Sequence, residues 1–249
     1  MSVTRMLTPH HRLTFTAALA LMVGLLTGCA SATPAPTATT PTSSPAPSVA
    51  PVAKSVGMVA TATVPEVAAL DAPNGSEVAR FTNPTASDAP LVFLVEEAQG
   101  DWLHVQLPMR PNGSTGWVRA SDMTLAQLHY SLAISTADRT LMLLKDNEPV
   151  KVFPAAIGTG DTPTPLGRFF IVELLEPTND GYGPYAYGLS AFSDVLNSFG
   201  GGPGQIGIHG TDDADSIGQA ASHGCIRLNN DDITYLAGIL PLGTPVTIT

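Results

Sequence analysis

Two short stretches in the second half of the chain decide how that half folds. They read Gln205-Ile206-Gly207-Ile208-His209-Gly210 and Ser222-His223-Gly224-Cys225-Ile226-Arg227-Leu228. Branched apolar residues alternate with other residues in each, which is the period of a β-strand with one buried face. The alternation places His209, His223 and Cys225 away from the buried faces. We therefore predict two strands that bring one cysteine and two histidines together.

A cysteine beside a histidine is a candidate nucleophile. A thiol with its ordinary pKa of about 8.5 is mostly protonated at neutral pH, and a neighbouring imidazole can accept its proton and stabilise the thiolate. Zinc ligation by His209, His223 and Cys225 is an alternative, since sulfur and imidazole suit that metal. The spacing offers only these three candidates and no further cysteine or acidic ligand at a recognised offset. We therefore expect a nucleophilic Cys225 and no metal.

The surrounding residues 127–249 have a mainly β pattern. Short apolar runs that predict strands occupy residues 130–135, 140–144, 149–157, 168–174, 206–209 and 245–248. One helix is expected, because Ile233, Leu236, Ala237 and Leu240 recur at helical spacing. Asn230 is its candidate N-cap.

This half of the chain resembles a known family. His209-Gly210-Thr211, with a Ser-His-Gly-Cys block that begins 13 residues after His209, is similar to the signature of the L,D-transpeptidase catalytic domain. The segment from Gly158 to Gly167 resembles the family's loop between two core strands. The resemblance runs from about Leu128 to Thr249. Some members have Asn two residues after the cysteine, where this chain has Arg227, so the role of that Asn does not transfer.

The resemblance implies roles for the residues that match the motif. Cys225 would be the nucleophile, and His209 would accept and donate protons with its ring oriented by the Gly210 carbonyl. The N–H groups of Gly224 and Cys225 would stabilise an oxyanion, because glycine allows a close backbone approach. His223 would support the pocket.

Substrate contacts are implied for three further side chains. Ser222 would line the pocket, and Arg227 would bind a substrate carboxylate through two hydrogen bonds. Residues 179–204 are rich in glycine and aromatic residues, and we interpret them as an irregular substrate cap that includes Tyr187. The alternative is a loop whose aromatic side chains tuck beneath it. Asp212, Asp213 and Asp215 follow His209 and are expected to form a solvated acidic loop rather than to stabilise an imidazolium.

The implied reaction requires no cofactor. The cysteine would attack the L,D peptide bond of a peptidoglycan stem tetrapeptide, expel D-alanine and pass the acyl group from a thioester to an amine, which forms a 3-3 cross-link. Alternatives are hydrolysis, as in an L,D-carboxypeptidase, attachment of a protein to the wall, or a non-catalytic wall-binding protein. The resemblance also implies inhibition by β-lactams of the carbapenem type, which would acylate the same cysteine.

The middle of the chain, residues 57–123, is expected to form a small β domain. Runs at residues 67–70, 91–95, 102–107 and 115–118 alternate with Asn-Gly turns at residues 74–75 and 112–113. The stretches 100–105 and 116–119 resemble bacterial SH3-like domains. Trp102 and Trp117 are expected in its core rather than on a ligand surface, and His104 on a surface strand.

The first 56 residues have the pattern of a targeting segment and a tether. Residues 1–28 carry two arginines, no acidic residue and an apolar run too short to span a bilayer. Leu26-Thr27-Gly28-Cys29 resembles a lipoprotein lipobox, which implies lipidation of Cys29; the alternative is an ordinary signal peptide. Residues 29–56 are a Pro-, Ala-, Ser- and Thr-rich linker. We expect an exported protein anchored to the outer face of the cell membrane, where a Cys29–Cys225 disulfide would be precluded by the lipid.

The net negative charge limits the classes of partner that this chain can bind. The 249 residues contain 11 Lys and Arg against 21 Asp and Glu, and removal of residues 1–28 would lower the count of basic residues to 11 − 2 = 9, for a net charge of 9 − 21 = −12. Such a chain lacks the basic surface that nucleic acids require. Peptidoglycan stem peptides are the partner that the family resemblance implies.

Overall fold

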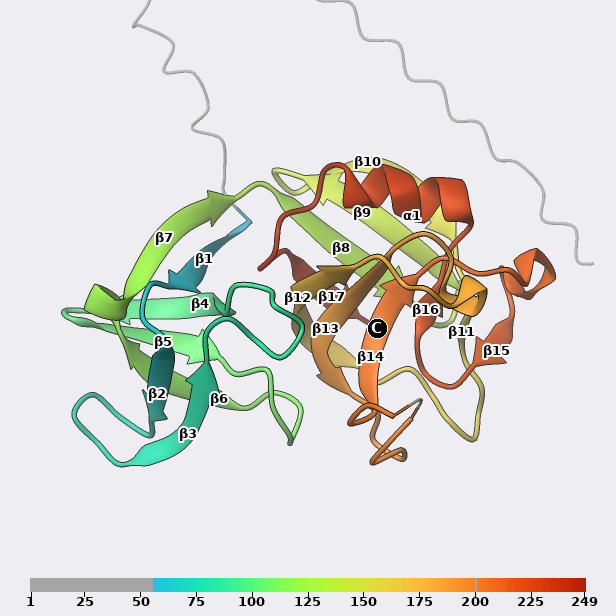
Figure 1. Ribbon diagram of the computed structural model, residues 1–249. Helices are drawn as coiled ribbons and strands as arrows, with labels where there is room; N and C mark the ends of the chain where they lie inside the picture. Colours follow the sequence, from blue (N-terminus) through green and yellow to red (C-terminus); the bar gives the residue numbers. More distant parts are fainter. Residues whose placement is uncertain (1–55, 200) are drawn as a thin grey trace, which may run out of the picture. The chain divides into compact units, whose positions relative to one another are not determined.

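The computed structural model describes residues 56–199 and 201–249, which lie in one compact unit. The predicted signal peptide, Cys29 and most of the predicted linker lie outside the described residues. Within the described part of the chain, no helix is long and apolar enough to cross a membrane. The fold is mainly β, as predicted, with two large sheets and one α-helix (Figure 1).

The first sheet builds an N-terminal module, residues 57–128, whose seven strands follow the order β3-β2-β6-β5-β4-β1-β7. The strands are β1 Gly57–Ala62, β2 Glu66–Leu70, β3 Glu77–Thr82, β4 Val92–Gln99, β5 Trp102–Gln106, β6 Thr115–Arg119 and β7 Met123–Leu128. Each neighbouring pair is antiparallel. The four runs predicted as strands in this region are confirmed.

The module ends later than the sequence indicated. β7 pairs with β1 along its whole length, from Met123 opposite Ala62 to Leu128 opposite Gly57. The first sheet therefore continues five residues past the predicted boundary at Met123. Residue 129 alone separates β7 from the first strand of the second sheet.

The two tryptophans of the module differ in burial. Trp102 is 7% exposed, as predicted for a core residue, and the Arg119 guanidinium lies 4.5 Å from its ring centroid. Trp117 is only half-buried, and its ring stacks on His104 at 4.9 Å. The placement of Trp117 in the core was therefore wrong, because the ring lies on the same sheet face as the surface residue His104, its cross-strand partner.

The second sheet has eight strands in the order β10-β9-β8-β17-β12-β13-β14-β16. Their bounds are β8 Tyr130–Ser135, β9 Thr140–Lys145, β10 Glu148–Pro154, β12 Gly167–Leu175, β13 Ala186–Phe192, β14 Gln205–His209, β16 Ile226–Arg227 and β17 Pro245–Ile248. β11, Ile157–Gly158, pairs with β15, Ala220–Ser222, in a separate two-stranded sheet. The predicted strands are confirmed, except that the run at 149–157 divides into β10 and β11.

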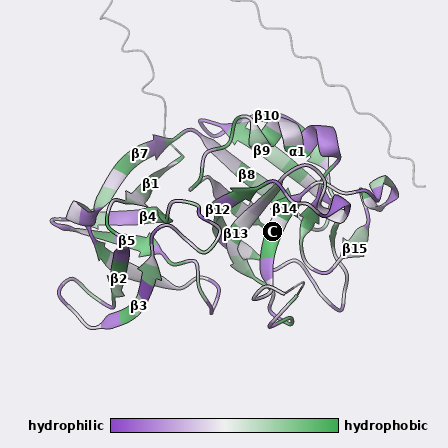
Figure 2. Ribbon diagram, in the orientation of Figure 1, coloured by the Kyte–Doolittle hydropathy of each residue, from purple (hydrophilic) through white to green (hydrophobic). Residues whose placement is uncertain are grey.

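Helix α1, Asn230–Ala237, covers the second sheet through Ile233 and Leu236, both fully buried. Its N-cap is Asn229 rather than the predicted Asn230. The Asn230 side chain is engaged elsewhere, since its Oδ1 accepts a hydrogen bond from the Thr211 N–H at 2.9 Å. Figure 2 shows the polar first turn of α1 in purple and the apolar part of β14 in green.

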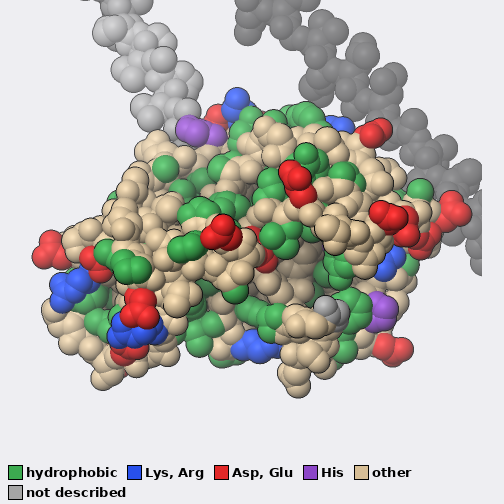
Figure 3. Space-filling model, viewed as in Figure 1, with side chains coloured by type: hydrophobic (Ala, Val, Ile, Leu, Met, Phe, Trp, Pro, Cys, Tyr) green, Lys and Arg blue, Asp and Glu red, His purple; other side chains and the backbone are tan. Residues whose placement is uncertain are grey.

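The two sheets share a small apolar cluster. Val59, Val92, Leu94 and Leu128 of the N-terminal module pack against Phe170 of β12, which is fully buried. This cluster joins the module to the sheet that carries the predicted site. On the face in Figure 3, Lys and Arg side chains are scattered rather than gathered in one patch.

Candidate active site

Two neighbouring strands bring the predicted residues together. β14 and β16 are parallel, with Ile208 opposite Ile226 and His209 opposite Arg227. His209 therefore closes β14, and Cys225 directly precedes β16. Both line a cavity of about 250 Å³, together with Ser222, His223 and Arg227, and with Gly181, Tyr182 and Phe199. The predicted convergence of one cysteine and two histidines is confirmed.

The His209 ring is held in one orientation. Its Nδ1 lies 2.6 Å from the carbonyl oxygen of Gly210. Because a carbonyl oxygen only accepts, Nδ1 carries the proton, and the neutral ring has its acceptor at Nε2. The Tyr182 ring lies against the imidazole, with 4.6 Å between centroids. His209 is only 4% exposed, so its free nitrogen is available chiefly to groups inside the cavity.

Glycine is required at position 210. A Cβ atom there would lie 2.3 Å from Asn230 Oδ1 and 3.1 Å from Gly183 Cα. The carbonyl that orients His209 thus belongs to a backbone segment packed directly on the start of α1.

Cys225 is half-buried, and its sulfur accepts a hydrogen bond from the Gly207 N–H at 3.4 Å. Burial raises the pKa of the thiol, although that hydrogen bond and the Arg227 charge act in the opposite direction. Burial also lowers the pKa of His209 to about 4. The site at neutral pH therefore holds a thiol beside a neutral imidazole. Burial thus favours the neutral form of each group, and the predicted thiolate stabilised by the imidazole stays a prediction.

Ser222 shapes the turn that precedes Cys225. Its hydroxyl donates to the Cys225 carbonyl at 2.5 Å and accepts from the Gly224 N–H at 3.1 Å. Ser222 is 2% exposed, so its hydroxyl serves the turn rather than a substrate, contrary to the sequence-based expectation. The Gly224 N–H, predicted as an oxyanion donor, is likewise engaged in the turn.

A threonine from a distant loop supports the same turn. The Thr164 hydroxyl accepts from the Gly158 N–H and donates to the Gly224 carbonyl, both at 2.9 Å. The Thr159 N–H donates to the Ser222 carbonyl at 3.0 Å. The segment from Gly158 to Gly167, recognised only as a family-like loop, thus supports the turn from Ser222 to Cys225.

Comparison with known proteins identifies this half of the chain. Residues 129–248 match the YkuD family model, which describes the L,D-transpeptidase catalytic domain. Over these residues, the chain is similar to L,D-transpeptidase catalytic domains.

Curated relatives match the same region. The putative L,D-transpeptidase YkuD of Bacillus subtilis is 39% identical over 119 residues, which are 48% of this chain and 65% of that protein. Its namesake in Bacillus licheniformis is 40% identical over 120 residues, again 48% of this chain and 66% of that protein. The chain thus spans slightly less than two thirds of the length of these relatives. A solved L,D-transpeptidase 3 of Mycobacterium tuberculosis, in complex with a faropenem-derived adduct, aligns with a TM-score of 0.46 at 15% identity, over 65% of this chain and 92% of that one.

Arg227 lines the cavity with a side chain that is 22% exposed. Its Nη1 lies 3.8 Å from Asp213 Oδ2, and its buried Nε has no hydrogen-bond partner in the described part of the chain. The Asp213 side chain is 58% exposed, so the predicted acidic loop is solvated at this residue. Arg227 therefore retains donors for an anionic ligand.

Tyr187 does not contact the cavity through its phenol group. It lies on β13, is fully buried, and donates its hydroxyl to the Leu236 carbonyl at 2.9 Å. The prediction that residues 179–204 are wholly irregular, with Tyr187 on a substrate cap, was wrong. β13 is buried on both faces between β12 and β14, so its sequence lacks the alternation that would have revealed it.

Other aromatic residues of that segment do line the cavity. Tyr182 contacts His209, and the Phe199 ring stacks on His223 at 4.9 Å. Only this part of the segment agrees with the predicted substrate cap.

The N-terminal module holds the chain on both sides of Phe199. Arg110 donates to the carbonyls of Ser193 at 2.7 Å, Leu196 at 2.9 Å and Pro203 at 3.2 Å. The Asn112 amide donates to the Phe192 carbonyl at 2.7 Å and accepts from the Phe192 N–H at 2.9 Å. Sequence reasoning missed these two residues, because their partners lie 80 or more positions away and no local pattern marks them.

Proposed function

We propose that this chain is a cell-wall L,D-transpeptidase that forms 3-3 peptidoglycan cross-links through a thioester on Cys225. The proposal rests on one observation above all: Cys225 and a His209 with its acceptor nitrogen free line the same cavity. The match to the catalytic domain family supports the same reaction class.

The neutral resting pair determines how acylation would begin. As the Cys225 sulfur attacks the carbonyl carbon of the donor's L,D peptide bond, His209 Nε2 takes the thiol proton, so that charge develops only when substrate is present. The tetrahedral intermediate collapses with loss of the C–N bond. The imidazolium returns its proton to the departing amine of D-alanine, and the acyl group remains on sulfur.

Deacylation repeats these steps with a second amine. Its nitrogen attacks the thioester, a C–N bond forms and the C–S bond breaks, and His209 carries the proton from nitrogen to sulfur. The Gly224 N–H is engaged by Ser222, so we assign the oxyanion to the Cys225 N–H. Arg227 would bind the donor's terminal carboxylate.

Mass spectrometry of the ectodomain with a stem tetrapeptide tests the proposal. We expect an acyl adduct on Cys225 in the wild type and none in Cys225→Ser or in folded His209→Ala. If the folded wild-type protein never forms the adduct, the chain is a non-catalytic wall-binding protein. Products of the complete reaction separate transfer from hydrolysis, because a carboxypeptidase yields a free tripeptide and a transpeptidase yields a cross-linked dimer. A carbapenem should give its own adduct on Cys225.

We also propose that the chain is a lipoprotein with an SH3-like module at the cell surface. The Leu-Thr-Gly-Cys run ending at Cys29 and the linker that follows support this localisation. Cys29→Ser should release the protein from the membrane fraction. Retention of that variant in the membrane would exclude lipid anchoring through Cys29.

A further inference from the structure

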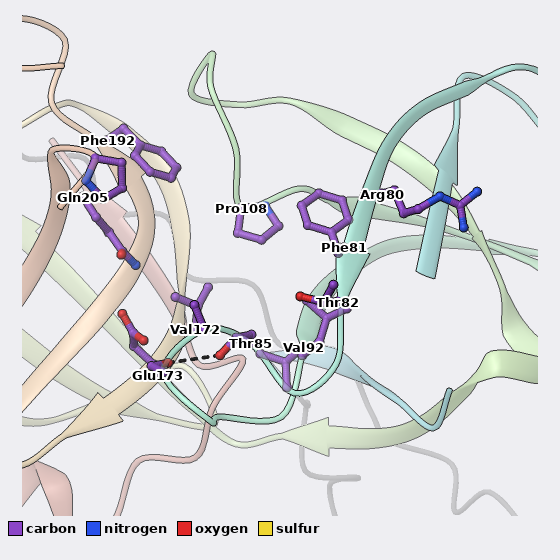
Figure 4. Close-up of a pocket in the computed structure, with 14 residues that line it drawn as sticks. Arg80, Phe81, Thr82, Thr85, Val92, Pro108, Val172, Glu173, Phe192 and Gln205 are labelled. Carbon is purple, nitrogen blue, oxygen red and sulfur yellow. Dashed lines mark hydrogen bonds between the residues drawn. The ribbon is translucent and has the colours of Figure 1, made fainter. Parts of the chain in front are cut away.

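A second, larger cavity lies between the N-terminal module and the transpeptidase domain. It has a volume of about 370 Å³, and Arg80, Phe81 and Pro108 line one side while Val172, Glu173 and Gln205 line the other (Figure 4). We name it the inter-sheet groove. No residue of the catalytic pair lines it, so any part in the reaction requires a connection to Cys225.

That connection exists through a third cavity of about 250 Å³. This junction cavity shares Glu173, Pro203 and Gln205 with the inter-sheet groove. It also shares Tyr182, Phe199, His209 and Cys225 with the cavity that Arg227 lines. The nucleophile therefore lies where two approaches meet, one bordered by Arg227 and the other by Glu173.

Glu173 is placed at this junction by a glycine. A Cβ atom at Gly188 would lie 2.4 Å from Glu173 Oε1 and 2.8 Å from Gln205 Nε2, so both side chains lie over a bare backbone. Gln205 is fixed by its hydrogen bond to the Leu189 carbonyl at 2.9 Å. Figure 4 shows the Glu173 and Gln205 side chains next to each other on the transpeptidase side of the groove.

Glu173 is half-buried, and Figure 4 shows a hydrogen bond between it and Thr85. Its carboxylate forms no ion pair within residues 56–199 and 201–249. Arg80, the cation that also lines the groove, is already paired with Glu77 and lies 3.6 Å from Glu66. A carboxylate in this position favours a cationic ligand, because a partly desolvated charge without an ion-pair partner gains from an opposite charge.

We propose that Glu173 binds the ammonium group of the acceptor stem peptide, which enters through the inter-sheet groove, while the donor binds on the Arg227 side. This inference rests on the proposed transpeptidase function. The bound ammonium loses one proton to solvent, and the resulting amine attacks the thioester carbon. The C–N bond forms, the C–S bond breaks, and His209, which lines both approaches, carries the second proton to the sulfur.

The test separates acylation from transfer. In Glu173→Gln, acylation of Cys225 by a stem tetrapeptide should proceed at the wild-type rate, while half-maximal transfer to a peptide with a side-chain ammonium should need about tenfold more acceptor, since loss of one ion pair of about 1.4 kcal/mol gives that factor. Glu148→Gln, an exposed glutamate of β10, is the matched control and should behave as wild type.

Hydroxylamine, which is mostly uncharged at neutral pH, serves as a second acceptor. Glu173→Gln should transfer to it as wild type does. An equal loss with both acceptors would assign Glu173 a structural role and overturn the proposal, as would an unchanged requirement for the ammonium peptide. Slower acylation would place Glu173 on the donor side and overturn it too. Failure of the transpeptidase function itself gives a distinct result, because then no variant forms the acyl adduct.

Discussion

The Cys225 sulfur accepts a hydrogen bond from the Gly207 N–H at 3.4 Å, so the proposed nucleophile is tied to the strand that ends in His209. This contact fixes the sulfur while burial keeps it protonated. The resting site is thus organised but uncharged, which gives it a characteristic dependence on pH.

The reactivity of Cys225 toward iodoacetamide should rise only at alkaline pH. Because burial raises the thiol pKa, the alkylation rate at pH 7 should lie below that of the same cysteine in denatured protein, whose pKa is about 8.5. Intact-mass measurements over a pH series would follow the rate. A rate that already reaches its plateau below pH 7 would contradict the neutral pair.

Stability should fall on the acid side of neutrality because of His209. Its pKa is lowered from 6.5 to about 4 in the folded state, so between these values the unfolded chain binds more protons. The free energy of unfolding should therefore decrease by about 3 kcal/mol as the pH falls from 6.5 to 4. Urea unfolding at several pH values measures it. His209→Gln should remove this part of the slope, and an identical slope in the variant would refute the assignment.

Thr164→Val should destabilise the turn from Ser222 to Cys225. The change leaves the Gly158 N–H and the Gly224 carbonyl without their shared partner, which should cost about 1–3 kcal/mol of stability and slow acylation of Cys225. Thermal unfolding and adduct formation report the two effects. Thr247→Val, at an exposed position of β17, is the control and should leave both unchanged. Equal behaviour of the two variants would remove Thr164 from its supporting role.

Gly224→Ala should abolish acylation. Gly224 has a φ of +116°, and an added Cβ would lie 3.0 Å from Ile206 Cδ1. We expect a loss of stability of about 1–2 kcal/mol from the backbone alone, with displacement of Cys225. Gly113→Ala, at a φ of +81° with no atom within 4 Å of the added Cβ, reports the cost of a positive φ without a side-chain clash. An active Gly224→Ala protein would show that the turn tolerates a side chain.

Arg110→Ala, a change in the N-terminal module, should slow the acylation of Cys225. Its guanidinium donates to three carbonyls on either side of Phe199, and hydrogen bonds from charged donors contribute about 1.5–3 kcal/mol each. We expect acylation at least about tenfold slower, since 1.4 kcal/mol is a factor of ten, with faster hydrogen exchange confined to residues near 193–196. Arg110→Lys should restore part of the rate. Wild-type acylation in Arg110→Ala would show that the module does not position this segment.

The sequence predicted those parts of the fold and site that have a local signature. Short apolar runs predicted β8 and β9, and alternating apolar residues predicted β14. The Ser-His-Gly-Cys block marked Cys225 as the candidate nucleophile. β13 escaped because both of its faces are buried, and Tyr187 was misplaced with it. The engagement of the Gly224 N–H depends on the Ser222 rotamer, and the contacts of Arg110 depend on packing between distant segments. Neither follows from residue order.

The apolar cluster around Phe170 bears on how this protein can be divided for production. An excised fragment that begins at residue 129 would leave Phe170 without Val59, Val92, Leu94 and Leu128. Such a fragment would expose the Phe170 ring to solvent and would tend to self-associate. Substitution of Phe170 by a polar residue would be the first remedy for a soluble, minimal enzyme.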